Sequence, residues 1–166
     1  MQTGLSKITE TGRNVLYLTL HISNDIIFNT KYLGECFMIN ILFCDDNTEF
    51  LSILFGYVRD IIQNDYRNIF KDAKFYSYDN GSGVISFAER ERVDVIFLDI
   101  DMKDLTGFET AKRLLEINGE TLIVFVSAYD QFVYDAFEFY PIAFLRKGKI
   151  RDELPKTVKR ICGILN

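Results

Sequence analysis

A net basic charge, long apolar runs and closely spaced cysteine pairs are all missing from this chain of 166 residues. The net charge of -5 argues against a nucleic-acid-binding face, because such faces are basic. No run reaches the roughly 18 apolar residues that a membrane-spanning helix requires. The three cysteines, Cys36, Cys44 and Cys162, are widely spaced, which favours reduced thiols in the cytoplasm over disulfides or a zinc site. The only histidine, His21, is expected to be structural or exposed.

The composition that remains is that of a globular protein, with 48% hydrophobic and 26% charged residues. The length suits one ordinary domain with a remainder. Residues 1–37 differ from the rest because their positive and negative charges balance. Within them, residues 15–20 could form a short strand. We therefore expect an N-terminal extension over 1–37 and a single domain over 38–166, without internal repeats.

From Met38 onward, strand-like and helix-like segments alternate, which is typical of a parallel sheet with helices on both faces. The predicted strands are 38–44, 74–78, 93–98, 121–126 and 142–146. Five helices are predicted. The first is capped by Asn47 or Thr48 and runs to 64, and the second follows a turn at 79–83 and runs to 92. The third and fourth cover 108–118 and 131–140, and the last is capped by Asp152 and runs to 165. Pro155 is expected in the first turn of the last helix, where proline is tolerated. We predict an α/β fold with a doubly wound five-stranded parallel sheet of order 2-1-3-4-5 and five helices, the flavodoxin-like arrangement.

Polar groups follow four of the predicted strands directly. Asp45 and Asp46 follow the first strand, Asp99 the third, Ser127 the fourth and Lys147 the fifth. The carboxyl ends of parallel strands share one edge, and ligands bind there where the strand order reverses. In order 2-1-3-4-5 that point lies between the first and third strands, so we expect the three carboxylates to meet.

Three close carboxylates repel one another and raise each other's pKa values. A divalent cation removes that conflict, and a shell made only of oxygen suits Mg²⁺. The Asp99 carboxylate is ionised at neutral pH and needs no general base to attack phosphorus, so the lack of a nearby histidine is no objection. Lys147 and Ser127 can then bind phosphoryl oxygens. The pattern predicts a site for phosphoryl transfer.

Several motifs together resemble a known family over residues 38–165. They are Ile-Leu-Phe-Cys-Asp-Asp at 41–46, Val-Ile-Phe-Leu-Asp-Ile-Asp-Met at 95–102, Gly107, Val-Ser-Ala at 126–128 and Phe-Leu-Arg-Lys at 144–147. This set resembles the CheY-like receiver domain of two-component response regulators. The stretches 98–102 and 136–145 are most similar to the LytTR class, in which a DNA-binding domain normally follows the receiver.

The resemblance implies a role for each acidic residue. Asp99 matches the phosphoacceptor, which takes its phosphoryl group from a sensor histidine kinase. Asp46 matches the direct Mg²⁺ ligand, and Asp45 matches the neighbour that acts through water. The backbone carbonyl of Asp101 matches the third protein ligand of the metal.

The resemblance also implies a switch. Ser127 and Lys147 match the pair that binds the phosphoryl group, and Phe144 matches an aromatic side chain that turns inward when Ser127 engages. Such a domain is not an enzyme beyond catalysing its own phosphotransfer and dephosphorylation. Its expected partners are the kinase and a second copy of itself upon phosphorylation. DNA is expected only through a C-terminal domain that this chain lacks, and no membrane is involved.

Five aromatic residues within 131–140 cannot all point inward, and we expect part of them to form the dimerisation surface. They are Phe132, Tyr134, Phe137, Phe139 and Tyr140. Two positions depart from the family pattern. Lys103 replaces a common proline after the acceptor, and Gly148 replaces a proline, usually in a cis bond, after Lys147. We expect Gly148 to loosen the loop that positions Lys147.

Two alternatives remain open. Asp99 and Asp101 have the Asp-x-Asp spacing of haloacid-dehalogenase-type phosphatases, but Lys103 stands where that motif has threonine. A pseudo-receiver that only binds a partner is the second alternative, and it predicts no affinity for Mg²⁺.

Overall fold

The computed structural model describes residues 3–10, 13–22, 25–29 and 38–165, and side chains only in the last range. The chain forms two compact units, Met1–Phe37 and Met38–Asn166. The first contains an antiparallel sheet of β1 (Thr3–Glu10), β2 (Arg13–Ile22) and β3 (Asp25–Asn29), in the order β1-β2-β3. The predicted strand 15–20 lies within β2. Cys36 is outside the described residues, and the side chain of His21 is too.

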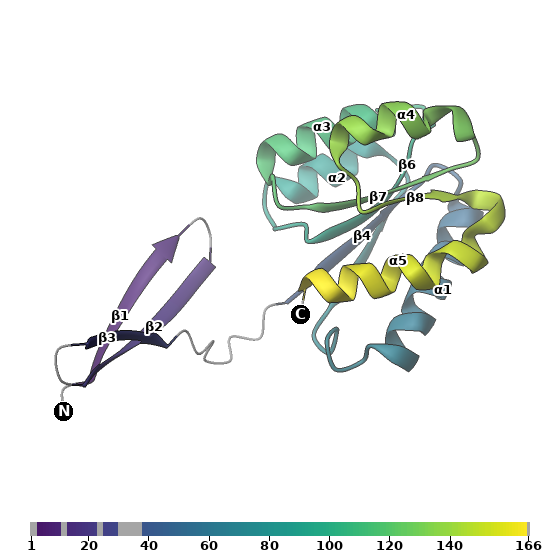
Figure 1. Cartoon of the computed structure of the whole chain (residues 1–166). Helices are drawn as coiled ribbons and strands as arrows, with labels where there is room; N and C mark the ends of the chain where they lie inside the picture. The colour runs from purple at the N-terminus through teal and green to yellow at the C-terminus, as the bar shows by residue number, and fades with distance from the viewer. Residues whose placement is uncertain (1–2, 11–12, 23–24, 30–37, 166) are drawn as a thin grey trace. The chain divides into compact units, whose positions relative to one another are not determined.

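The second unit is built on one parallel sheet of five strands (Figure 1). The strands are β4 (Asn40–Cys44), β5 (Lys74–Tyr78), β6 (Val95–Asp99), β7 (Leu122–Ser127) and β8 (Ala143–Arg146). Their order, β5-β4-β6-β7-β8, confirms the predicted order 2-1-3-4-5. The three central strands, β4, β6 and β7, are buried almost throughout because both faces of the sheet are covered.

Helices cover both faces of this sheet (Figure 1). The helices are α1 (Thr48–Asp65), α2 (Gly81–Ala88), α3 (Gly107–Ile117), α4 (Val133–Ala136) and α5 (Ile150–Leu165). One core cluster joins α1 and α5 to one face, with Leu54 and Val158 almost fully buried. The other joins α2, α3 and α4 to the opposite face, with Val84 and Leu114 fully buried. The two clusters hold the strands rigidly, which fixes the positions of their carboxyl ends.

Side-chain caps set where two helices begin after the strand ends. Asn47 caps α1 by accepting a hydrogen bond from the backbone N–H of Phe50 at 3.1 Å. Thr106 and Glu109 form a reciprocal capping box at the start of α3. The predicted start of α1 is confirmed, and α3 begins one residue before the predicted one.

The aromatic segment after β7 differs from the single helix predicted over 131–140. It consists of the 3₁₀ turn η1 (Asp130–Phe132), the single turn α4 and a second 3₁₀ turn, η2 (Phe137–Phe139). The rings of Phe132 and Phe139 both pack on Phe108. The segment ends at Tyr140, whose backbone lies in the left-handed region with a φ of 47°. Ring packing, rather than helical periodicity, therefore sets this geometry.

The predicted boundaries of two other helices were wrong. Helix α2 begins at Gly81, inside the expected turn, because the Asn80 side chain caps it by accepting a hydrogen bond from the N–H of Gly83. It ends at Ala88 instead of 92. Helix α5 begins at Ile150, so Asp152 lies within its first turn and is not the cap. Pro155 is consequently the sixth residue of α5 rather than part of the first turn.

Among the described residues, no helix has the length and apolarity needed to cross a membrane. Cys44 and Cys162 are free and buried. Burial raises the pKa of Cys44 to about 12 and that of Cys162 to about 11, so both thiols remain protonated and unreactive.

Candidate metal and phosphoryl site

The predicted acidic residues meet at the carboxyl edge of the sheet. Asp45 and Asp46 follow β4, and Asp99 ends the neighbouring strand β6, in a ladder that pairs Cys44 with Leu98. One carboxylate oxygen from each of the three lies within 4.8 Å of the others. Asp45 and Asp99 are almost fully buried, with exposures of 1% and 4%, whereas Asp46 is half-buried. This donor set of converging oxygens fits a hard divalent cation such as Mg²⁺.

Lys147 brings a positive charge to the same cluster. Its Nζ lies 2.7 Å from Asp45 Oδ2 and 3.0 Å from Asp99 Oδ2, and 4.9 Å from the ring centre of Phe50 on α1. Burial alone would lower the pKa of Lys147, but the hydrogen bond to Asp45 and the charge of Asp99 outweigh it, so the pKa is raised. The ammonium therefore stays charged at neutral pH and bridges two carboxylates.

Asp99 titrates at a higher pH than an ordinary aspartate. Burial, and then the charge of Asp45, raise its pKa from 3.8 to about 6, against the opposing influence of Lys147. The sequence argument named repulsion between the carboxylates as a cause of raised pKa values. Burial is the larger one, because Asp99 ends a strand that is buried on both faces. At neutral pH the carboxylate is still mainly ionised and so remains a nucleophile.

Ser127 and Phe144 lie on the two strands beyond Asp99. Ser127 is fully buried at the end of β7 and follows Val126, which is the ladder partner of Asp99. Its Oγ accepts a hydrogen bond from the N–H of Tyr129 at 3.1 Å. Phe144 on β8 is half-buried against the core cluster that contains α4. Their predicted roles in binding and switching stay predictions.

An open pocket of about 520 Å³ adjoins the acidic cluster. Asp46, Asn47, Asp101, Met102 and Lys103 line it. The side chains of Asp101 and Lys103 are exposed, and Lys103 Nζ lies 3.9 Å from Asp46 Oδ2. The pocket leaves the Asp46 edge of the cluster open to solvent. The predicted metal contact through the Asp101 carbonyl stays a prediction.

Gly107 permits a close approach of the loop to the backbone of Asp99. A Cβ at this position would lie 2.2 Å from the backbone oxygen of Asp99 and 2.7 Å from Cα of Ile100. The N–H of Gly107 instead donates to the carbonyl of Ile100 at 2.9 Å. Gly107 is therefore needed for this close contact with the backbone of Asp99.

Sequence reasoning missed a clamp beside Lys147. The Glu153 carboxylate on α5 accepts hydrogen bonds from the backbone N–H of Arg146 at 3.0 Å and from its Nε at 2.8 Å, and the second guanidinium nitrogen contacts the same carboxylate. Burial would raise the pKa of Glu153, but these hydrogen bonds outweigh it and lower the pKa. Arg and Glu seven residues apart carry no recognisable sequence signal, because the pairing depends on how the loop turns.

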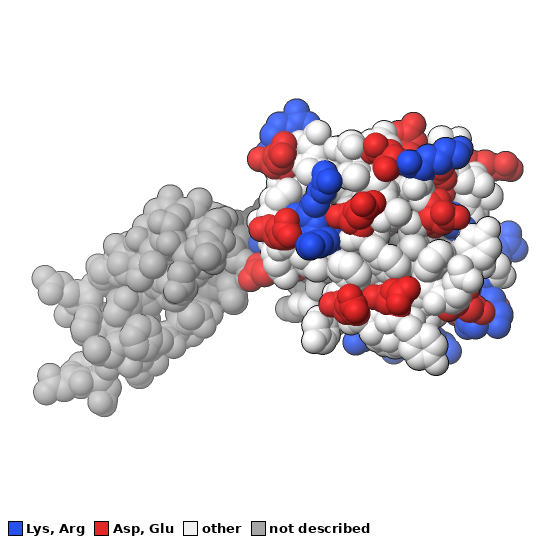
Figure 2. All heavy atoms as spheres, turned by 90° about the horizontal axis from the view of Figure 1, so that it is seen from above, with Lys and Arg blue, Asp and Glu red and all other residues white. Residues whose placement is uncertain are grey.

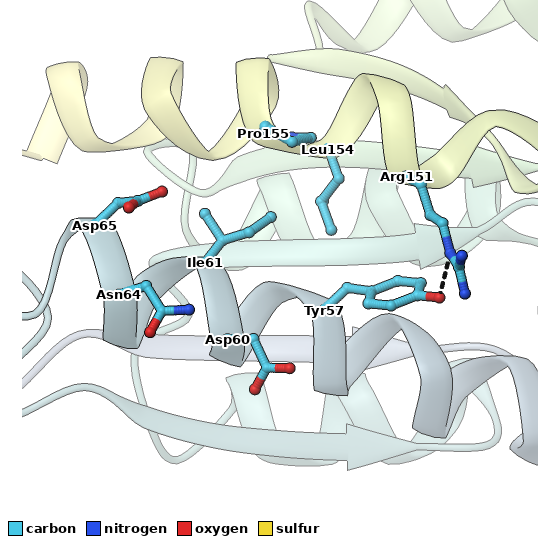
Figure 3. Close-up of a pocket in the computed structure, with 8 residues that line it drawn as sticks. All are labelled: Tyr57, Asp60, Ile61, Asn64, Asp65, Arg151, Leu154 and Pro155. Carbon is cyan, nitrogen blue, oxygen red and sulfur yellow. Dashed lines mark hydrogen bonds between the residues drawn. The ribbon is translucent and has the colours of Figure 1, made fainter.

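A separate pocket of about 310 Å³ lies between α1 and α5 (Figure 3). Ile61 and Leu154 meet in its middle, and Asp60 lies along α1. At one end Arg151 Nε donates to the hydroxyl of Tyr57 at 2.5 Å, and its guanidinium carbon lies 5.2 Å from the centre of that ring. This pocket offers a contact surface and no cluster of reacting groups. On the face seen in Figure 2, charges of both signs are interspersed without a continuous basic area.

Known proteins resemble the chain across its second unit, Met38–Asn166. The family described as the response regulator receiver domain matches residues 41–159. An uncharacterized response regulatory protein of Vibrio cholerae is 41% identical over 85 residues, which are 51% of this chain and 33% of that protein. The sensory transduction protein LytT of Bacillus subtilis is 36% identical over 70 residues, which are 42% of this chain and 29% of LytT. The matches thus span about a third of the length of these curated relatives.

Solved structures agree with the sequence comparisons at the level of the fold. Response regulator TrrA of Thermotoga maritima, in complex with Mg²⁺ and BeF, superposes with a TM-score of 0.61 at 21% identity, over 75% of this chain and 99% of TrrA. The family match covers well over half of the chain, and the sheet order and acidic cluster agree with it. The chain belongs to the response regulator receiver domain family of two-component signalling.

Proposed function

We propose that this receiver accepts a phosphoryl group on Asp99 from a sensor histidine kinase. One observation carries the proposal: Asp99 ends β6 within a cluster that also holds Asp45, Asp46 and the Lys147 ammonium. A buried carboxylate beside both a cation-binding group of oxygens and a fixed ammonium suits nucleophilic attack on phosphorus. A carboxylate that served only as a helix cap would not need Lys147.

In the proposed step, a carboxylate oxygen of Asp99 forms a bond to phosphorus. The bond from phosphorus to the imidazole nitrogen of the phosphohistidine breaks, and that nitrogen retains the electron pair. Lys147 exchanges one of its carboxylate contacts for a phosphoryl oxygen and neutralises negative charge there. The Ser127 hydroxyl donates a hydrogen bond to another phosphoryl oxygen. Catalysis is positioning plus electrostatics, as is general for phosphoryl transfer.

Receiver domains bind Mg²⁺ at their acidic pocket, and the residues of this pocket fit the ion. We assign Asp45, Asp46 and Asp99, with the backbone carbonyl of Asp101, as the groups that would hold it. When bound, Mg²⁺ would supply positive charge next to the phosphoryl oxygens. The three carboxylates then differ in role, because Asp99 both holds the ion and reacts, whereas Asp45 and Asp46 only hold the ion.

The proposed output is a change at the surface formed by the segment after β7. Ser127 ends β7, and Phe144 on β8 packs against the same core cluster as the underside of this segment. Tyr134, Phe137 and Tyr140 are 83%, 64% and 91% exposed on its outside. Exposed aromatic side chains gathered on one short segment are typical of a contact surface. We propose that phosphorylation makes this surface bind a second copy of the chain.

Further parts of the proposal concern the whole protein. Relatives of this chain include LytT and the transcriptional regulatory protein YpdB of Escherichia coli, and both are longer than the matched segment. We propose that a DNA-binding domain provides the output and that DNA is contacted only through it. The proposed location is the cytoplasm, in keeping with the free thiols of Cys44 and Cys162.

Labelling by acetyl phosphate tests the acceptor. The wild-type chain should take up one phosphoryl group per molecule in a Mg²⁺-dependent reaction, and Asp99→Asn should take up none, as read by intact-mass spectrometry. Undiminished labelling of the Asp99→Asn variant would refute the assignment. Multiple turnover of a phosphomonoester would instead support a phosphatase. Absence of both Mg²⁺ binding and labelling would support a pseudo-receiver.

A further inference from the structure

The loop from β8 to α5 carries Lys147 without the proline that receivers commonly have after this lysine. Gly148 takes that place, and the described residues contain no cis peptide bond. Residues Lys147–Lys149 form a 3₁₀ turn, η3, that runs directly into α5. A Cβ at Gly148 would meet no atom within 4 Å, so packing does not restrain the turn at this residue. The flexible backbone of glycine therefore leaves the position of Lys147 to other contacts.

The Arg146–Glu153 clamp spans this turn. Both oxygens of the Glu153 carboxylate are used: Oε2 accepts the backbone N–H of Arg146, and Oε1 accepts the guanidinium. Arg146 is the residue immediately before Lys147, and Glu153 lies on the first turn of α5. The carboxylate thus joins the end of β8 to the helix on the far side of the glycine. Its side chain is 21% exposed, so water screens these charge-assisted bonds only in part.

We infer that Glu153 is a positioning residue that holds Lys147 against Asp45 and Asp99, in place of the restraint that a proline would provide. This role rests on the proposed phosphoacceptor function of Asp99. Only the backbone next to Lys147 is clamped, so Glu153 acts on the reaction through Lys147 and not by contact with the phosphoryl group.

Loss of the clamp has two consequences that point in opposite directions. A less fixed Lys147 stabilises the transferring phosphoryl group less, which slows labelling, since misplacement of a catalytic group by about 1 Å can cost up to roughly a hundredfold. The same ammonium competes with Mg²⁺ for the oxygens of Asp45 and Asp99. Loosening it should therefore strengthen Mg²⁺ binding. General damage to the fold would instead lower both the labelling rate and the affinity for Mg²⁺.

The experiment measures both quantities in Glu153→Ala and Glu153→Gln. We expect the labelling rate with acetyl phosphate at saturating Mg²⁺ to fall about tenfold in Glu153→Ala, within the range for a displaced catalytic group. We expect its affinity for Mg²⁺, measured by calorimetry without phosphodonor, to rise about threefold, which is within the range of a partly exposed ion pair. Glu153→Gln keeps an acceptor for the Arg146 N–H and should lie between wild type and Glu153→Ala.

Two further variants connect the effect to the loop and to Lys147. Gly148→Ala restricts the turn without a clash and should restore part of the labelling rate in the Glu153→Ala background. In a Lys147→Ala background, Glu153→Ala should cause no further loss, because both changes act through one group. The neighbouring exposed carboxylate on the same helix is the control, and Asp152→Ala should behave as wild type.

Several results would overturn the role of Glu153: an unchanged labelling rate, a Mg²⁺ affinity that is unchanged or lower, or a full additional loss in the Lys147→Ala background. A wild-type chain that takes up no phosphoryl group would instead refute the acceptor proposal. In that case the Mg²⁺ affinities of wild type and Glu153→Ala, which need no phosphodonor, would still decide whether Glu153 holds Lys147.

Discussion

Replacing Asp99 with asparagine should stabilise the metal-free protein at neutral pH. Burial and the charge of Asp45 raise the pKa of Asp99 from 3.8 to about 6, so folding makes its ionised form less favourable. The difference is about two pKa units, and each is equivalent to about 1.4 kcal/mol, so ionised Asp99 costs the fold about 3 kcal/mol. The Asp99→Asn variant has no such charge and should avoid most of this cost.

The sign of the pH dependence follows from linkage. Between about pH 4 and about pH 6 the folded protein binds the Asp99 proton more tightly than the unfolded chain does, so stability falls as the pH rises. The wild type and Asp99→Asn should therefore be similar near pH 4, and the variant should be more stable by about 3 kcal/mol above about pH 7. An Asp99 carboxylate with an ordinary or lowered pKa would give no such gain.

Urea unfolding with a metal chelator, followed by circular dichroism near pH 4 and near pH 7.5, measures this difference. Glu138→Gln removes one charge from an exposed position and is the matched control, with little expected effect. Mg²⁺ at a hundred times its dissociation constant should stabilise the wild type by about 2.7 kcal/mol and so cancel most of the variant's advantage. A variant that is no more stable than wild type at high pH, or whose advantage is equal at both pH values, would refute the reasoning.

Three further predictions concern single contacts. Lys147→Ala should lower the metal-free free energy of unfolding by about 2 to 3 kcal/mol, because it leaves two buried carboxylates without their cation, and Mg²⁺ should restore much of it in the same urea assay. Gly107→Ala should lower the free energy of unfolding by about 3 kcal/mol through its clash with the backbone of Asp99, whereas Gly56→Ala inside α1, with open space around its Cβ, should be neutral or stabilising by thermal unfolding. Tyr134→Ser with Phe137→Ser should abolish beryllofluoride-dependent dimerisation in sedimentation velocity without loss of stability; an unchanged dimer would exclude this surface.

The sheet and the positions of the acidic residues were predictable because each depends on a short, local pattern. The strand Val95–Asp99 is buried throughout, and its apolar run stops at a carboxylate. Once five such runs alternate with helices, the switch-point rule determines which strand ends are neighbours. The meeting of Asp45, Asp46 and Asp99 follows from that rule without knowledge of any long-range contact.

Features that depend on the packing of side chains far apart in sequence were not predictable. The aromatic spacing over 131–140 is compatible with a helix, but Phe132 and Phe139 both pack on Phe108, and this packing divides the segment into short turns. The start of α5 was assigned to Asp152 because capping residues are read from sequence, whereas the helix continues from the turn at Lys147–Lys149. The contact between Glu153 and Arg146 was not predictable for the same reason, because it depends on how the turn at Lys147–Lys149 brings the two residues together.

The segment after β7 consists of three short helical turns, and this affects how fast its amide protons exchange with solvent. Helix α4 spans only Val133–Ala136, so the segment contains few of the i to i−4 hydrogen bonds that protect amide protons in a longer helix. Its amide protons should exchange with solvent deuterium far faster than those of α1, and opening it requires disruption of little besides the contacts of Phe132, Ala136 and Phe139. Rearrangement of this part of the surface therefore costs little free energy, and the proposed phosphorylation of Asp99 need change the relative free energies of its conformations only slightly to shift their populations.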